Sequence, residues 1–129
     1  MMHMLHDSEL VALSVNRAIK FARLEFRLES GEGIFAEMYG LRAFRSEDFV
    51  LQNVVSRILY SSRGDLEPKR LMYWLDWATR LSDAGSWLPD KKREDWLCAC
   101  MSGDLELIVI EPSVGAQVVA ICDEVALRK

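Results

Sequence analysis

The chain has 129 residues, of which 50% are hydrophobic and 28% charged, and its formal net charge is −4 at pH 7. This composition excludes an intrinsically disordered chain, and the length predicts a single domain over residues 1–129. The longest apolar runs are shorter than the ~20 residues of a membrane-spanning helix, and the N-terminus lacks the pattern of a signal peptide. With three cysteines, an odd number, these features predict a protein with reduced thiols in the cytoplasm.

The first third of the chain predicts a β meander. Residues 23–29, "RLEFRLE", alternate strictly between polar and apolar types, as in a strand with one buried face, although several apolar residues here also fit helical spacing. A strand over 10–15 precedes this segment. The turn "SGEG" follows it and leads into a third strand over 34–41.

Residues 46–60 fit two different structures. Ser46, followed by two acidic residues, could cap the N-terminus of a helix. Residues 54–60 are instead rich in β-branched and aromatic types, which favour a strand. The residues alone leave both alternatives open.

One main helix is predicted over about 66–83. Pro68 suits its first turn, and apolar residues from Leu71 to Leu81 recur at helical spacing. The charged segment 89–95, "PDKKRED", is expected to be a surface loop. Strands are expected over 96–101, 105–111 and 116–127. The sum is an α+β fold, with a mostly antiparallel sheet of about seven strands and this one main helix.

The acidic residues are concentrated in the last third of the chain. Between positions 94 and 127 there are seven acidic residues and no Lys or Arg: Glu94, Asp95, Asp104, Glu106, Glu111, Asp123 and Glu124. Such a segment is commonly a solvated face, and the alternative is a surface that attracts a basic protein. The net negative charge argues against direct binding to nucleic acid, because phosphate contacts require clustered Lys and Arg.

Two pairs of residues could in principle bind a metal. His3 and His6 have suitable spacing, but no third ligand is evident nearby. Cys98 and Cys100 would lie on one face of a predicted strand, without the second cysteine pair of a zinc site, and packing in the core explains them better. No residues suggest a nucleophile with its base. We therefore expect no enzymatic activity, no cofactor and no metal. The sequence alone does not decide whether the histidine pair or the cysteine pair binds a metal.

Two aromatic residues of the predicted helix are candidate anchors for a partner. Tyr73 and Trp77 are four residues apart and would lie together on a flank of the helix. Exposed aromatic side chains often dominate the energetics of protein interfaces. The alternative is that both residues cover the edge of the sheet.

Four segments, 6–15, 23–33, 39–55 and 111–122, resemble a group of small uncharacterised bacterial proteins. This group is similar to the immunity proteins of polymorphic and contact-dependent growth inhibition toxin systems. The positions that carry the pattern are His6, Asp7, Asp48, Phe49, Gln52, Asn53, Pro112, Ser113 and Gly115. The resemblance implies a strand over 51–61 and attaches no catalytic role to these residues.

The resemblance implies a non-enzymatic binding protein that neutralises a cognate toxin, often a nuclease, by covering its active site. Such toxins are commonly basic, so the acidic third of the chain, with Tyr73 and Trp77, is the expected interface. The alternative is a homo-oligomeric structural or small-ligand-binding protein. Asp48, Gln52 and Asn53 are expected to hydrogen-bond the backbone of a turn, with Phe49 packed against the core.

Overall fold

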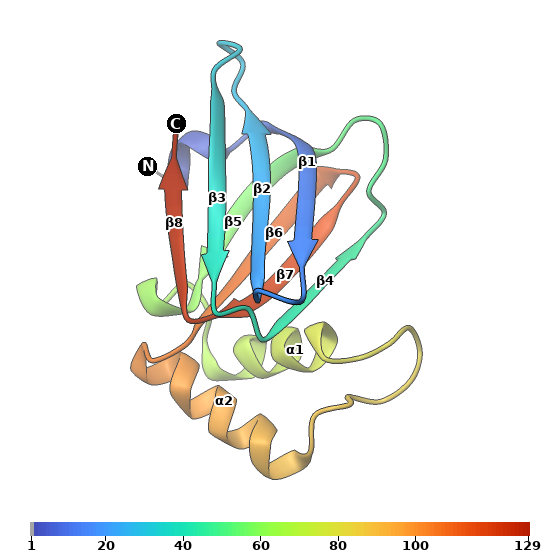
Figure 1. Ribbon diagram of the computed structural model, residues 1–129, viewed down its shortest axis with the longest axis vertical. Helices are drawn as coiled ribbons and strands as arrows, with labels where there is room; N and C mark the ends of the chain where they lie inside the picture. Colours follow the sequence, from blue (N-terminus) through green and yellow to red (C-terminus); the bar gives the residue numbers. More distant parts are fainter. Residues whose placement is uncertain (1) are drawn as a thin grey trace.

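The computed structural model describes residues 2–129, with side chains from residue 4 onward. It is an α+β fold in which one eight-stranded sheet, antiparallel at every pairing, carries two α helices at one end (Figure 1). The strands are β1 (Glu9–Asn16), β2 (Phe21–Arg27), β3 (Gly33–Tyr39), β4 (Ala43–Glu47), β5 (Val54–Tyr60), β6 (Glu106–Val114), β7 (Gln117–Cys122) and β8 (Glu124–Arg128). The helices are α1 (Pro68–Ala78) and α2 (Asp90–Ser102), with short 3-10 helices η1 (Met2–Leu5) and η2 (Ser61–Arg63).

The sheet folds over itself into two halves. Its strand order is β4-β7-β6-β5-β1-β2-β3-β8, and β1 meets β5 through a single residue pair, Glu9 with Val54. Figure 1 shows β1, β2, β3 and β8 crossing in front of β5, β6, β7 and β4. The main core fills the space between the halves, where Leu24, Phe26 and Ile108 are fully or almost fully buried.

A second core lies on the other face of β6 and β7. Helix α1 packs there, and its Leu75 is buried with Leu107 of β6 and Val119 of β7. Because β6 and β7 are covered on both faces, each has four or more consecutive buried residues rather than an alternating pattern. None of the helices in residues 2–129 is both long and apolar enough to cross a membrane.

The coarse prediction of an antiparallel α+β fold is confirmed, and its details need correction: eight strands replace about seven, and two helices replace one. Helix α1 is shorter than the predicted 66–83, because the chain leaves the helix at Thr79. The Thr79 hydroxyl donates to the Leu75 carbonyl at 2.9 Å, and the Thr79 carbonyl accepts the Trp87 N–H at 2.8 Å. These contacts end the helix and close residues 80–86 into a loop between Thr79 and Trp87.

The prediction of a surface loop over 89–95 and a strand over 96–101 is wrong, because residues 90–101 belong to α2 and Pro89 is its N-cap. The charged residues form the first turns, where Arg93 donates to Asp90 at 2.6 Å. The later residues of α2 do not alternate in burial as a strand would. Cys100 is buried, whereas Cys98 and Met101 are exposed. Gly103, with φ +89°, ends the helix in the left-handed conformation.

The predicted strand 116–127 is divided at Asp123 into β7 and β8, which lie in different halves of the sheet. The Asp123 N–H donates to the Tyr39 carbonyl at 2.9 Å, and the Asp123 carboxylate accepts Arg42 at 3.0 Å. The alternatives for 46–60 are also decided. Ser46 lies inside β4 rather than at a helix cap, and residues 54–60 form β5.

Candidate functional site

The loop between β4 and β5, residues 48–53, is the candidate site, and we call it the tip loop. Its organising residue is Asn53, whose side chain is buried and makes four hydrogen bonds. The Asn53 Oδ1 accepts the N–H groups of Val50 at 2.9 Å and Ala116 at 3.1 Å. Its Nδ2 donates to the carbonyls of Val50 at 2.8 Å and Leu10 at 3.2 Å. One amide thus ties the loop to β1 and to the β6–β7 turn.

The β6–β7 turn is fitted closely to this amide. Gly115 has φ +85°, and a Cβ at this position would overlap the Asn53 Oδ1 and lie 3.0 Å from the Gln52 carbonyl oxygen. On the other side of the turn, the Ser113 hydroxyl donates to the Val54 carbonyl at 3.3 Å. Since both polar atoms of the Asn53 side chain are paired inside the protein, this side chain anchors the loop at its C-terminal end.

The tip loop presents apolar side chains to solvent. Phe49 is 45% exposed, Val50 50% and Leu51 99%, and Val114 of the neighbouring turn is 51% exposed. The expectation that Phe49 packs against the core is wrong, and Asp48 before it is in the left-handed conformation, with φ +62°. An ordered loop with three consecutive exposed apolar residues is unusual on a surface that nothing covers.

The sequence singled out only part of this loop. Of the three polar residues expected to hold the turn, Asn53 lies inside it, whereas the side chains of Asp48 and Gln52 are exposed. Val50 and Leu51 were not among the candidates. The sequence feature that could have identified them is the apolar run 49–51, which stands between Asp48 and the pair Gln52-Asn53. The conformation that exposes this run depends on hydrogen bonds of Asn53 with Leu10 and Ala116, which are 43 and 63 residues away in the sequence.

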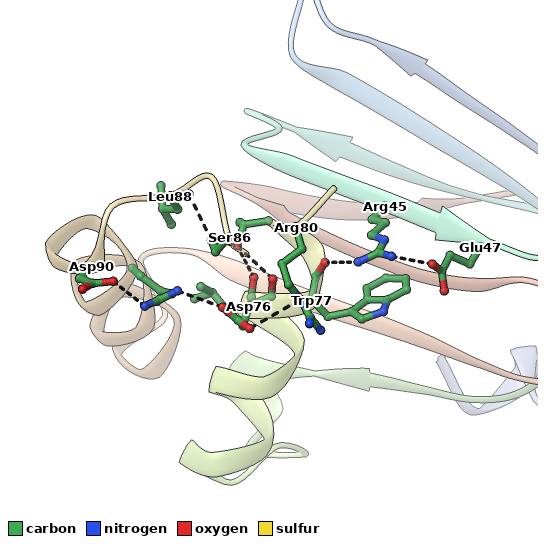
Figure 2. Close-up of polar contacts among 11 residues, drawn as sticks. Arg45, Glu47, Asp76, Trp77, Arg80, Ser86, Leu88 and Asp90 are labelled. Carbon is green, nitrogen blue, oxygen red and sulfur yellow. Dashed lines mark hydrogen bonds and ion pairs between the residues drawn. The ribbon is translucent and has the colours of Figure 1, made fainter. Parts of the chain in front are cut away.

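The two candidate aromatic anchors separate in the structure. Tyr73 is 57% exposed on α1, but Trp77 is buried, with only 8% of its surface accessible, so the two do not form one exposed flank. Figure 2 shows why: Arg45 of β4 donates to the Trp77 carbonyl at 2.8 Å and pairs with Glu47 at 2.6 Å. The Arg45 guanidinium also lies 4.2 Å from the centre of the Trp77 ring. Trp77 therefore fixes α1 to the sheet.

The same figure shows how α1, α2 and the segment between them are joined. Asp76 of α1 pairs with Arg93 of α2 at 3.0 Å and with Arg80 at 3.6 Å. The hydroxyls of Thr79 and Ser86 lie 2.5 Å apart. These contacts join α1, α2 and the segment between them, although the buried Arg80 Nε has no hydrogen-bond partner within the described residues.

Three of the seven candidate acidic residues are engaged within the protein. Glu106 accepts three hydrogen bonds from Ser61 and Ser62 at the start of η2. Glu111 pairs with Arg57 and, at 3.5 Å, with Arg70. The third, Asp123, pairs with Arg42 as described above. These three carboxylates therefore already have partners within the protein, which makes them less suited to bind a basic partner.

The other four acidic residues are spread over separate elements. Glu94 and Asp95 are exposed on α2, Asp104 is exposed in the turn before β6, and Glu124 is exposed at the start of β8. None of the four forms an ion pair within the described part of the chain. The accessible acidic residues without an ion pair thus lie on α2, in the turn after it and at the start of β8, rather than on one face.

The cysteine pair also differs from the expectation, because both residues lie on a helix and face different ways. Cys98 is exposed and Cys100 is buried. Burial, with the nearby Glu106 carboxylate, raises the pKa of the Cys100 thiol to about 12. The same causes raise the pKa of Cys122 to about 12. Both buried thiols are therefore protonated and unreactive at neutral pH.

The histidine pair can be described only in part, because the His3 side chain lies outside the described residues. The His6 Nε2 is 3.5 Å from the Asp7 carboxylate, and its Nδ1 contacts the Ser56 carbonyl. Among the described residues, no three His, Cys, Asp or Glu side chains are grouped so that they could bind one metal ion.

Among the described candidate residues, the tip loop is the segment that exposes several consecutive apolar side chains. The loop offers exposed apolar side chains that could anchor a partner and one exposed carboxylate, that of Asp48. The sequence matches no protein-family model, and no similar protein was found among curated proteins or solved structures.

Proposed function

We propose that this protein is a non-enzymatic immunity protein, which binds a cognate toxin through the tip loop and covers the toxin's active site. The observation that carries the proposal is the ordered display of Phe49, Val50 and Leu51. Large apolar side chains that enter a pocket of the partner supply most of the affinity of many interfaces.

The fixed conformation of the loop favours binding. A loop that is already ordered before it meets its partner loses little conformational entropy on association, so more of the contact energy appears as affinity. The four hydrogen bonds of Asn53 provide this order. The toxin would meet a preformed apolar knob rather than a flexible segment.

The charges around the apolar residues suit a basic toxin. Asp48 precedes Phe49, is exposed, and has no ion-pair partner in the described part of the chain. The chain as a whole carries a net charge of −4. A toxin that acts on nucleic acid has a cationic active site, which attracts an acidic inhibitor and speeds their association.

Co-expression with the toxin encoded beside its gene tests the proposal. The wild-type protein should restore growth, co-purify with the toxin and block its activity. The Phe49→Ala/Leu51→Ala variant should bind roughly a hundredfold more weakly, because it removes two anchoring side chains. Leu81→Ala/Met101→Ala is the matched control, since Leu81 and Met101 are also exposed but lie outside the loop. A wild-type protein that neither binds nor protects would refute the proposal.

Light scattering separates the proposal from the alternative of a homo-oligomer. An inhibitor of this kind is expected to keep its tip loop free before the toxin arrives. If the wild-type protein is an oligomer and Phe49→Ala/Leu51→Ala is a monomer, the loop is an interface between copies and the immunity function fails.

A further inference from the structure

A groove lies between the β1–β2 hairpin and the start of β4. Figure 1 shows the turn of this hairpin next to the chain that enters β4. We call this groove the hairpin groove, and its main lining residues are Val15, Arg17, Lys20, Leu41, Phe44 and Trp87. Its volume is about 580 Å³. A smaller hollow of about 300 Å³ continues from it, sharing Lys20 and Leu41 and reaching Trp96 of α2. Together these volumes are in the range of binding pockets.

The groove is preformed by backbone contacts. The Asn16 side chain accepts the N–H groups of Ala18 at 3.1 Å and Ile19 at 3.3 Å, which shapes the hairpin. Lys20 follows in the left-handed conformation, with φ +52°. Its carbonyl accepts the Leu41 N–H at 2.9 Å, so the hairpin and the opposite wall of the groove are held together.

The walls of the groove are apolar and aromatic. Val15 is 46% exposed and Trp87 50% exposed, while Leu41 and Phe44 are half-buried. The Trp87 ring packs edge-on against Trp96, with 6.3 Å between the ring centres. Trp87 is therefore fixed in orientation while half of it remains available to a ligand.

The groove is cationic in a protein that is acidic overall. Arg17 and Lys20 have no acidic partner within the described residues, and the third cation, Arg42, pairs with Asp123 at 3.0 Å. Asp123 is the one acidic residue that lines the two hollows. The groove thus carries a local positive charge, while the net charge of the chain is −4.

We propose that the hairpin groove binds an extended segment of a partner protein in which acidic side chains flank an apolar one. The apolar side chain packs between Trp87 and Phe44, and the carboxylates pair with Arg17 and Lys20. Edge strand β4, which pairs only with β7, borders the groove and offers backbone groups to an extended chain. A nucleic acid fits less well, because it has no peptide groups that could pair with the free edge of β4.

This inference does not depend on the tip loop or on the proposed immunity function. The groove and the loop are lined by different residues, so a variant of one leaves the other intact. A toxin could bind normally to a protein whose groove is disabled. The two proposals are therefore tested by separate substitutions.

Selection from a random peptide display library on the purified full-length protein tests the inference. The selected peptides should be enriched in Asp and Glu next to an aromatic or aliphatic residue, and their affinity should fall as salt is added. Arg17→Glu/Lys20→Glu should weaken their binding at least roughly tenfold, and Trp87→Ala roughly thirtyfold. Lys91→Glu/Lys92→Glu is the matched control, with the same charge change on exposed residues of α2.

Far-ultraviolet circular dichroism should be unchanged in all these variants, and thermal unfolding should be unchanged in the charge variants, whose substituted side chains are exposed. Trp87→Ala should unfold at a slightly lower temperature, because it loses the contact with Trp96. The inference is overturned if no acidic-apolar peptide is enriched, or if the enriched peptides bind the groove variants as they bind the wild type. Single-stranded oligonucleotides form a second arm. If they bind the wild type, lose binding in Arg17→Glu/Lys20→Glu and outcompete the peptides, the groove is a nucleic-acid site instead.

Discussion

Gly115 lies against the side chain of Asn53, so closely that any residue with a Cβ would overlap the Asn53 carboxamide oxygen. The two residues are far apart in sequence and belong to different turns. Their contact fixes the tip loop against the β6–β7 turn, because Asn53 also accepts the N–H of Ala116, the residue after Gly115. The display of the apolar loop residues therefore depends on a glycine outside the loop.

Substitution Gly115→Ala is expected to lower the free energy of unfolding by about 3 kcal/mol, from the left-handed backbone and the overlap together. Gly31→Ala is the matched control, since Gly31 has a similar φ of +91° and nothing within 4 Å of its Cβ position. The control should cost only about 1–2 kcal/mol. Urea unfolding measures both values, and equal losses would show that the contact with Asn53 has no energetic role.

Substitution Asn53→Ala should lower the free energy of unfolding by about 2–4 kcal/mol, because it leaves buried backbone groups without partners. It should also loosen the tip loop and expose the peptide bonds after Phe49 and Leu51 to chymotrypsin. The control Gln52→Ala removes an exposed side chain and should change stability by less than about 0.5 kcal/mol. Cleavage of both variants at the wild-type rate would contradict the anchoring role of Asn53.

The elements predicted correctly from the sequence are those in which the order of polar and apolar residues follows which side chains are buried. Strands β2 and β3 alternate because one face meets the core and the other meets solvent, and this periodicity is visible without the rest of the chain. Helix α1 has its apolar residues at helical spacing for the same reason.

The elements predicted wrongly are those whose structure depends on distant residues. The run from Trp96 to Met101 fits a buried strand and a helix equally well, and its packing under α1 decides for the helix. The break at Asp123 depends on Arg42, 81 residues away. The outward direction of Phe49 likewise depends on contacts that bring Leu10 and Ala116 to Asn53.

The three cysteines should differ sharply in reactivity. Cys98 is exposed, whereas Cys100 and Cys122 have no accessible surface, and burial raises the pKa of each of these two thiols to about 12. Titration of the native protein with a thiol reagent should therefore modify Cys98 alone, and all three should react in denaturant. Cys98→Ser should abolish the fast reaction. A fast-reacting thiol in native Cys98→Ser would contradict the burial of Cys100 and Cys122.

The free energy of unfolding should fall at acidic pH, in part because the Asp65 carboxylate becomes protonated. Burial acts to raise the pKa of the Asp65 carboxyl, but hydrogen bonds from the Tyr60 N–H at 2.9 Å and from Arg63 outweigh it and hold the pKa below its usual range. A carboxyl with a lower pKa in the folded state stabilises that state above the unfolded value of about 4, and the stabilisation is lost as the pH falls through the folded value.

The comparison with Asp65→Asn isolates this carboxyl. At pH 7 the variant should be less stable than the wild type, and the difference should shrink as the pH falls below about 4, because the wild-type carboxyl becomes protonated as well. Glu94→Gln is the control: Glu94 is exposed on α2 without an ion pair in the described part of the chain, so its curve should follow that of the wild type. Chemical unfolding at a series of pH values measures all three proteins. A gap between wild type and Asp65→Asn that stays constant down to the lowest pH would mean that the hydrogen bonds from Tyr60 and Arg63 do not favour the ionised carboxylate.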